Sequence, residues 1–89
     1  MARYMVVETF TQGPEPIYER LAERGRMMPE GLQYVDSWID ETDRRRCFQL
    51  METGDPSLFD QWTSNWDDIM EFEVVPVIGS AEAAERSSR

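Results

Sequence analysis

The chain has 89 residues, which is enough for one domain, although a domain of this size is only marginally stable as a monomer. Its 18 acidic and 9 basic residues give a net charge of −9, which argues against nucleic acid or a membrane as a partner because both are themselves anionic. All nine basic residues are arginine, so the composition excludes Schiff-base lysines, imidazole bases and histidine-ligated haem, zinc or iron. We therefore expect no cofactor and no metal site.

Cys47 is the single cysteine of the chain, so an internal disulfide is impossible. The apolar stretch near the N-terminus is too short for a secretion signal, and a lone reduced thiol in such a chain predicts a cytoplasmic protein. On a strand, Arg46 points to the face opposite Cys47 and does not activate it. We expect Cys47 to be buried and inert.

The first part of the chain predicts a strand, a helix and a second strand. Residues 4–10 are rich in β-branched and aromatic side chains, which is typical of a strand. A glycine–proline turn then leads into a helix that places Ile17 and Leu21 on one stripe and ends before Pro29. Residues 32–39 again have the composition of a strand.

The second part predicts a strand, a helix and a final strand. Residues 45–52 predict the third strand, which forms an antiparallel hairpin with the second through the polar turn at 40–44. Asp55 and the proline after it predict the start of a helix, with the aspartate as N-cap and the proline at the first helical position. Residues 72–78 predict the last strand, and Pro76 within it indicates an edge strand or a bulge because proline cannot donate to a sheet ladder.

This order of elements, β-α-β-β-α-β, predicts an α+β fold of the ferredoxin-like type, an antiparallel four-stranded sheet with two helices on one face. We expect a single domain over residues 3–79. Residues 80–89 are small or charged, and we expect them to form a disordered tail.

Most of the predicted strands carry large apolar side chains on consecutive residues, as in Met5-Val6-Val7. Because successive strand side chains point to opposite faces of a sheet, both faces need cover. Two helices cover one face only. We therefore expect two copies of the chain to pack their remaining faces together as a homodimer, a dimeric α/β barrel.

Three segments carry a resemblance to a known family, namely residues 31–38, the run Arg46-Cys47-Phe48-Gln49-Leu50-Met51-Glu52, and residues 72–77. Over residues 3–79 the chain resembles a bacterial domain-of-unknown-function family of short, ferredoxin-like proteins of the dimeric α/β-barrel superfamily. The resemblance implies this fold and a homodimer, and it carries no catalytic residues over. The wider superfamily includes cofactor-independent monooxygenases, small isomerases, haem-degrading enzymes and stress-response proteins, and the lack of histidine argues against haem binding here.

Three tryptophans in so short a chain suggest either a ligand pocket or a dense core. Aromatic and methionine side chains form the walls of many pockets for flat or apolar ligands, and Trp38 and Trp62 are our candidates for such a wall. Trp62 and Trp66 lie one helical turn apart, however, and that spacing fits ordinary packing equally well.

Three polar residues complete the list of candidate pocket residues. Gln49 shares a strand face with Cys47 and Met51, so its amide needs a hydrogen-bond partner, either a ligand or another residue of the protein. Glu52 at the end of the same strand has the chemistry of a base or of an ion-pair partner for Arg26. Arg26 itself can bind a ligand carboxylate.

Two functions remain open at this point, and the sequence does not decide whether the chain is an enzyme. The first is a homodimer that binds a small apolar or aromatic ligand between sheet and helices. The alternative is a cofactor-independent monooxygenase or isomerase acting on a small apolar substrate, with Trp38, Gln49 and Glu52 orienting the substrate and Glu52 as the base. A solvent-accessible pocket containing a carboxylate of raised pKa would favour the enzyme.

Overall fold

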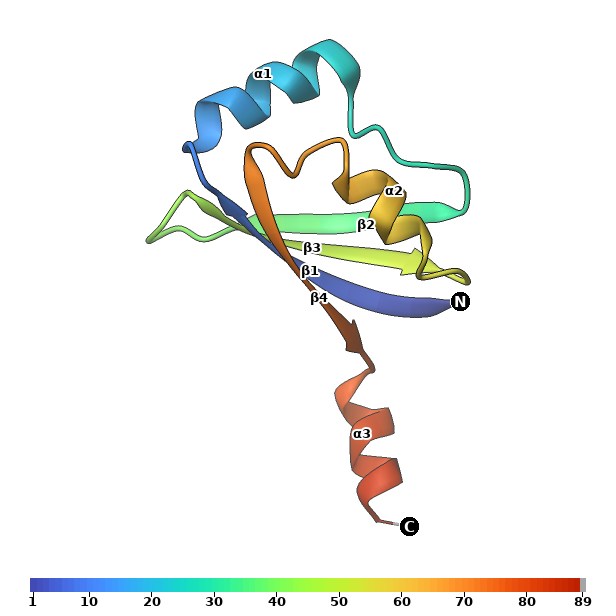
Figure 1. Cartoon of the computed structure of the whole chain (residues 1–89). Coiled ribbons are helices and arrows are strands. Elements are labelled where there is room, and N and C mark those ends of the chain that lie inside the picture. Colours follow the sequence, from blue (N-terminus) through green and yellow to red (C-terminus); the bar gives the residue numbers. More distant parts are fainter. Residues whose placement is uncertain (89) are drawn as a thin grey trace.

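Four antiparallel strands form one sheet in the order β2-β3-β1-β4, and helices α1 and α2 lie on one face of it (Figure 1). The computed structural model describes residues 1–88. Its strands are β1 (Ala2–Phe10), β2 (Leu32–Ile39), β3 (Arg46–Thr53) and β4 (Met70–Val77), and its helices are α1 (Pro14–Arg24), α2 (Leu58–Thr63) and α3 (Ser80–Ser87). The strand order and the βαββαβ sequence of the first six elements confirm the predicted α+β, ferredoxin-like fold.

Glycine and proline residues mark the two ends of α1 and the edge position of β4. Pro14 lies in the first turn of α1, and Gly25 ends the helix with a φ of 66°, donating its N–H to the carbonyl of Leu21 at 2.8 Å. Pro76 lies on β4 opposite Tyr4 of β1. Because β4 has a neighbour on one side only, the missing N–H of proline is tolerated there, as predicted.

The second helix is shorter than the sequence suggests. Asp55 does not cap a helix at the following proline; its carboxylate instead accepts hydrogen bonds from the backbone N–H and the hydroxyl of Ser57, at 3.0 and 2.6 Å. This turn delays the helix until Leu58. Trp66 therefore lies beyond the end of α2, in the turns that lead to β4, although its side chain is buried.

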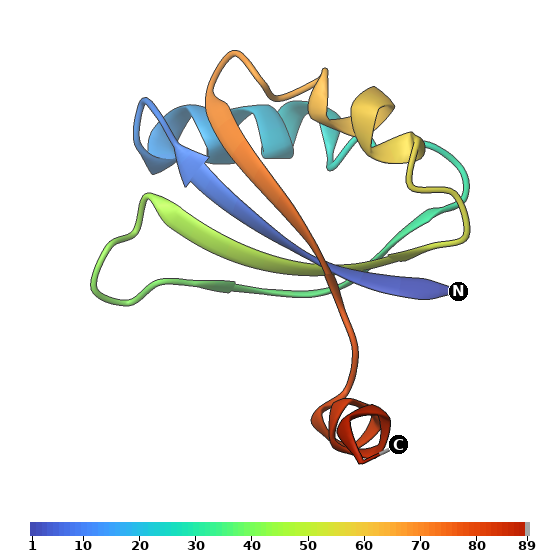
Figure 2. The same cartoon turned by 60° about the horizontal axis from the view of Figure 1, so that its bottom comes forward.

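The C-terminal segment differs from the disordered tail expected over residues 80–89. Residues 80–87 form α3, which is rich in alanine, the residue of highest helix propensity, and carries an ion pair of 3.1 Å between Arg86 and Glu82. None of the residues of α3 is buried. The helix projects from the end of β4 on the side of the sheet opposite α1 and α2 (Figure 2). Residue 89 lies outside the described residues.

The core lies between the sheet and the two helices that cover it. Side chains that alternate along the two central strands, β1 and β3, reach this core, and those that are buried are Val6, Glu8, Phe10, Cys47, Gln49, Met51 and Thr53. In the antiparallel register Glu8 lies directly opposite Cys47, and Val6 lies opposite Gln49. Polar groups thus share the buried face with large apolar ones.

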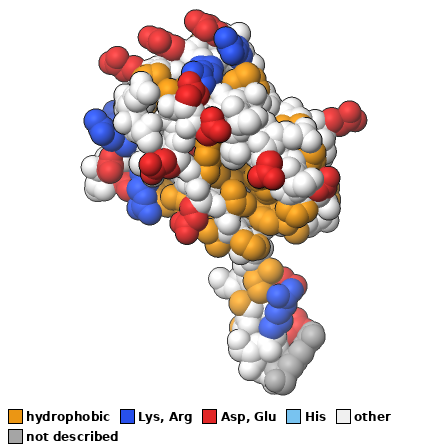
Figure 3. Space-filling model, in the orientation of Figure 1, with side chains coloured by type: hydrophobic (Ala, Val, Ile, Leu, Met, Phe, Trp, Pro, Cys, Tyr) orange, Lys and Arg blue, Asp and Glu red, His pale blue; other side chains and the backbone are white. Residues whose placement is uncertain are grey.

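Neither α1 nor α2 covers the opposite face of the sheet, which we call the open face. Its apolar side chains, placed by the strand register, are Met5, Val7, Trp38, Phe48, Leu50, Val75 and Val77. Trp38 is 48% exposed, although tryptophan is usually well covered. Figure 3 shows hydrophobic side chains gathered over the sheet near the start of α3.

A β-bulge in β2 decides which face each residue of that strand joins. Tyr34 pairs with Met51 and Asp36 with Leu50, so two residues of β2 span one step of β3. The extra residue reverses the alternation: Tyr34 faces the helices, and so does Ser37, whose hydroxyl lies 2.7 Å from the tyrosine hydroxyl. Trp38 then points to the open face, where it lies opposite Phe48.

Candidate functional site

A cavity of about 40 Å³ lies between the centre of the sheet and the helices. Its walls are formed by α1, β1, β3 and the segment from α2 to β4, with lining residues Glu8, Ile17, Leu21, Arg26, Gln49, Trp62, Trp66 and Met70. Five of these eight side chains are apolar or aromatic. Glu8 and Arg26 carry charge, and Gln49 carries an amide.

Glu8 is the most deeply buried charged residue of this site. Its side chain is only 3% exposed, and it lies between Val6 and Phe10 on the helix-facing side of β1. Burial raises the pKa of its carboxyl group to about 7, because desolvation disfavours the charged form; a hydrogen bond from the Cys47 thiol and the charge of Arg26 act in the opposite direction. Glu8 therefore exchanges a proton near neutral pH.

Cys47 is the thiol partner of Glu8. Desolvation raises its pKa to about 12, and the charge and hydrogen bond of Glu8 raise it further, against a smaller effect of Arg26. The thiol thus stays protonated and serves as a hydrogen-bond donor to the carboxylate. This environment agrees with the inert, buried cysteine that the sequence predicts.

Arg26 is held in place by α2 and by the turns that follow it. Its carbonyl oxygen accepts hydrogen bonds from the indole N–H groups of both Trp62 and Trp66, at 3.0 and 3.2 Å. The next carbonyl, of Met27, accepts from the Asn65 amide at 3.2 Å, and Met27 itself adopts a φ of 55°, which non-glycine residues rarely adopt. Three hydrogen bonds therefore fix an irregular turn just after the end of α1.

The side chain of Arg26 reaches from this turn to the sheet. Its guanidinium carbon lies 3.8 Å from the centre of the Tyr34 ring, and Nη1 donates to Oε1 of Gln49 at 3.1 Å. Gln49 in turn donates its Nε2 to the sulfur of Met51 at 3.4 Å. The amide of Gln49 is thus oriented by Arg26, and the guanidinium is held beside the cavity.

The structure brings three of the five predicted pocket residues together and separates the other two. Arg26, Gln49 and Trp62 line the cavity. Trp38 and Glu52 lie on the open face, with the sheet between them and the cavity. Glu52 pairs with Arg3 at 2.8 Å rather than with Arg26.

Trp38 and Glu52 lie away from the cavity for two different reasons. Trp38 would share a face with Tyr34 in a regular strand, and the bulge between them moves it to the other face. Glu52 is an even-numbered residue on a strand whose odd-numbered side chains, Gln49 and Met51 among them, face the helices. Simple alternation therefore separates Glu52 from Gln49.

Sequence reasoning missed Glu8, the carboxylate that the cavity does contain. The signal for it is present in the strand itself: Glu8 has the same parity as Val6 and Phe10, and it lies opposite Cys47 once the sheet order is known. A charged residue in the middle of an apolar strand face is uncommon, because burial of an ionised group is costly.

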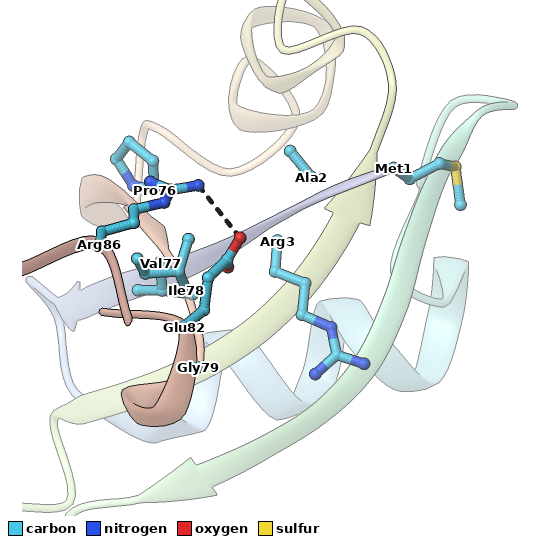
Figure 4. Close-up of a pocket in the computed structure, with 9 residues that line it drawn as sticks. All are labelled: Met1, Ala2, Arg3, Pro76, Val77, Ile78, Gly79, Glu82 and Arg86. Carbon is cyan, nitrogen blue, oxygen red and sulfur yellow. Dashed lines mark hydrogen bonds and ion pairs between the residues drawn. The ribbon is translucent and has the colours of Figure 1, made fainter. Parts of the chain in front are cut away.

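A larger cleft of about 690 Å³ lies elsewhere, between α3 and the ends of β1 and β4. Figure 4 shows Glu82 and Arg86 paired with each other along one side of α3, while the guanidinium of Arg3 extends away from them. The residues lining this cleft include Met1, Val77 and Ile78, and all of the lining residues are at least partly exposed. The cleft lacks the desolvated polar groups found beside the cavity.

Within residues 1–88 no group of three or more histidine, cysteine, aspartate or glutamate side chains is placed to hold a metal ion. No helix in the same part of the chain is both long and apolar enough to cross a bilayer.

Comparison with known proteins identifies one family. A family model described as a domain of unknown function (DUF3303) matches residues 2–89, nearly the whole chain. No curated protein matches the chain, and no solved structure matches it. The arrangement of the cavity is therefore the basis for any argument about activity.

Proposed function

Since the chain belongs to the family of the domain of unknown function DUF3303, we propose a function from its own site: the protein binds a small, largely apolar molecule that carries one polar group. The observation that supports this is the cavity itself, where apolar walls surround three converging polar side chains, Glu8, Arg26 and Gln49. Pockets of this composition bind apolar ligands and orient them through a few polar contacts.

The size of the cavity limits which part of a ligand it receives. A volume of about 40 Å³ has room for two or three water-sized groups beside the present side chains and not for a whole ligand. The polar end of a ligand therefore fits as the structure stands. The apolar body of a larger ligand extends outward beside the partly exposed side chains of Leu21 and Arg26. The other directions are closed, because Ile17, Trp62 and Trp66 are each at most 5% exposed.

A cavity-filling variant tests this proposal. Small carbonyl and carboxyl compounds with an apolar body are screened by thermal shift and isothermal titration calorimetry, with nucleotides, metal ions and haem as comparison ligands. We expect saturable binding of one or more apolar compounds, lost in Leu21→Trp, which fills the cavity from α1. Ala22→Trp adds the same ring on the exposed side of that helix and should leave binding unchanged.

Two results would contradict the proposal. One is binding that persists unchanged in Leu21→Trp, which would place the ligand elsewhere. The other is a nucleotide, metal ion or haem that binds more tightly than every apolar compound, because the cavity offers no phosphate cradle and a single carboxylate, that of Glu8, as a metal ligand.

We also propose that the protein acts as a homodimer that joins two open faces. Monomeric proteins rarely expose apolar patches as continuous as the row formed by Val75, Met5 and Leu50, which are neighbours across three strands. A closed two-fold dimer buries both copies of the patch at once. With its single cysteine reduced and buried, we place this dimer in the cytoplasm.

Light scattering on a sizing column tests the dimer. The wild-type mass should be twice the chain mass of 10.5 kDa. Leu50→Arg should give a folded monomer, because the new charge lies opposite Asp36 on β2 and is paired within the chain, yet cannot be buried against a second apolar face. Gln61→Arg adds the same charge on the exposed side of α2, and this variant should remain a dimer. A wild-type monomer would contradict this part of the proposal.

A second candidate function is favoured by one observation, the raised pKa of Glu8. The alternative considered from the sequence was a cofactor-independent monooxygenase or isomerase with Glu52 as its base. In the structure the carboxylate beside the cavity belongs to Glu8 and not to Glu52. Because the pKa of Glu8 is also raised, Glu8 replaces Glu52 as the candidate base.

A further inference from the structure

We propose that Glu8 is the catalytic base of a proton-transfer reaction on a small β,γ-unsaturated carbonyl compound, with Arg26 holding the carbonyl oxygen. This inference rests on the ligand-binding cavity proposed above. It goes further by naming the substrate class and the residue that carries the chemistry.

The geometry of the cavity places a base and an oxyanion partner on different walls. Glu8 projects from the centre of β1, a strand hydrogen-bonded on both sides and therefore rigid. Arg26 enters from the turn after α1, and its position is fixed by the Tyr34 ring and by Gln49. Both side chains line the same cavity, so a small group bound there contacts both. Gln49 acts as a positioning residue for the guanidinium.

The groups that surround Glu8 make its carboxylate a base that works near neutral pH. The titratable group from β3 is the Cys47 thiol, which stays protonated, and the charged group from the turn after α1 is Arg26. The neighbouring strand β4 presents Phe72 and Met70. The helical side presents apolar and aromatic groups, Ile17, Leu21, Trp62 and Trp66. A base in such surroundings is stronger than one in water, and its pKa of about 7 suits proton transfer at physiological pH.

The reaction balances with the substrate and this residue alone. The Glu8 carboxylate removes a proton from the carbon between the carbonyl group and the double bond, so a C–H bond breaks and an O–H bond forms on Glu8. The electron pair moves to the carbonyl oxygen as a dienolate, which accepts hydrogen bonds from the Arg26 guanidinium. Glu8 then returns the proton to the γ-carbon, and the double bond moves into conjugation. The step requires no oxidant, reductant or cofactor.

Deuterium exchange and isomerisation are measured on the full-length protein with cyclohex-3-enone, but-3-enal and pent-4-en-2-one as probes in D2O. Proton NMR follows deuterium entering the probe, and ultraviolet absorbance follows the conjugated product. We expect catalysed exchange and conversion of at least one probe. The rate constant kcat/KM should rise with pH and level off above about 7, as the carboxylate form of Glu8 becomes dominant.

Three variants assign the role. Glu8→Gln should lower kcat by at least about 100-fold, the usual contribution of a general base, while the dissociation constant of the probe stays within a few fold. Glu8→Asp keeps a base on a shorter side chain and should recover part of the activity together with the pH profile. Glu73→Gln removes a carboxylate from the open-face side of β4 and should retain full activity.

The possible failures are distinguishable. Probes that bind saturably without any exchange, or exchange that survives in Glu8→Gln, would overturn the base assignment and leave the proposed ligand binding intact. If neither the probes nor any compound of the wider screen binds, the proposed function falls and this inference with it.

Discussion

The two faces of the same central strands have opposite chemistry. On the helix-covered face of β1 and β3, the polar groups of Glu8, Cys47 and Gln49 lie among fully buried apolar side chains. On the open face the same strands present Val7 and Leu50, which are only partly buried. Both faces are built from one alternating pattern, and they differ in the side chains that they present and in the cover that the helices provide.

This difference is the basis on which we propose two tasks, ligand binding on one side of the sheet and association on the other. Desolvation is strong only where helices exclude water, so the carboxylate whose pKa is raised lies on that side. The open face has no buried polar group to satisfy and can meet a second apolar surface at little cost. Rigid central strands support both sides, which suits a site that requires fixed geometry.

The largest effect that separates the two faces is expected from a charge placed in the core. Met51→Asp puts an unpaired carboxylate at a position with no exposure and should cost about 3–5 kcal/mol, enough to unfold most of a domain of this size. Circular dichroism should show loss of the folded spectrum. Leu50→Arg, one residue earlier on the open face, should keep it; equal damage from both variants would mean that the faces are not distinct.

The next effect concerns the pH dependence of stability. Between the unfolded pKa of 4.5 and the folded pKa of about 7, the folded protein keeps a proton on Glu8 that the unfolded chain has lost. The free energy of unfolding should therefore fall as pH rises through this range, by about 3 kcal/mol, and level off above it. Urea unfolding at fixed protein concentration measures this slope.

Two variants test the origin of that slope. Glu8→Gln should flatten it and make the protein more stable than wild type above pH 7, because the amide has no charge to desolvate. Glu52→Gln changes a carboxylate on the open face and should preserve the slope. A slope unchanged in Glu8→Gln would show that another group titrates.

A smaller effect is expected at Cys47. Cys47→Ala removes a buried sulfur and should lower the free energy of unfolding by about 1–2 kcal/mol. It also removes the hydrogen bond that lowers the Glu8 pKa, so the pH range of the stability change should shift upward. In the wild type, Ellman's reagent should label the thiol slowly until denaturant is added. Rapid labelling of the native protein would argue against its burial.

The smallest effect is expected from removing α3. A chain that ends at Gly79 loses a helix with no buried residue, so its stability should change by no more than about 0.5 kcal/mol. Thermal unfolding of the two chains measures this directly. A marked loss of stability would show that α3 supports one of the two faces.

Much of the fold follows from local sequence signals. Residues 32–39 form the predicted strand with its predicted bounds, because β-branched and aromatic side chains favour a strand locally. The first helix ends before Pro29, as predicted, and Gly25 is the residue at which it stops. The helix at 80–87 was missed because its small and charged residues are equally common in helices and in disordered segments. Its alanines decide in favour of the helix.

The candidate site was less accessible to sequence reasoning because it depends on which face each side chain joins. One extra residue in β2 moved Trp38 across the sheet, and no local signal marks that bulge. The link from the Arg26 carbonyl to Trp62 and Trp66 spans 36 to 40 positions and appears only in three dimensions. The position of Glu8 on the buried face, by contrast, follows from the alternation of side chains along β1.

The distribution of the tryptophans gives each face of the sheet its own optical signal. Trp38 is 48% exposed on the open face, whereas Trp62 and Trp66 are 2% and 3% exposed beside the cavity, with their indole N–H groups bonded to one carbonyl. Emission from Trp38 should be red-shifted and open to quenching by acrylamide in a monomer and shielded in a dimer. Blue-shifted emission from the buried pair should respond instead to a ligand. Association and ligand binding can therefore be followed separately in one unlabelled sample.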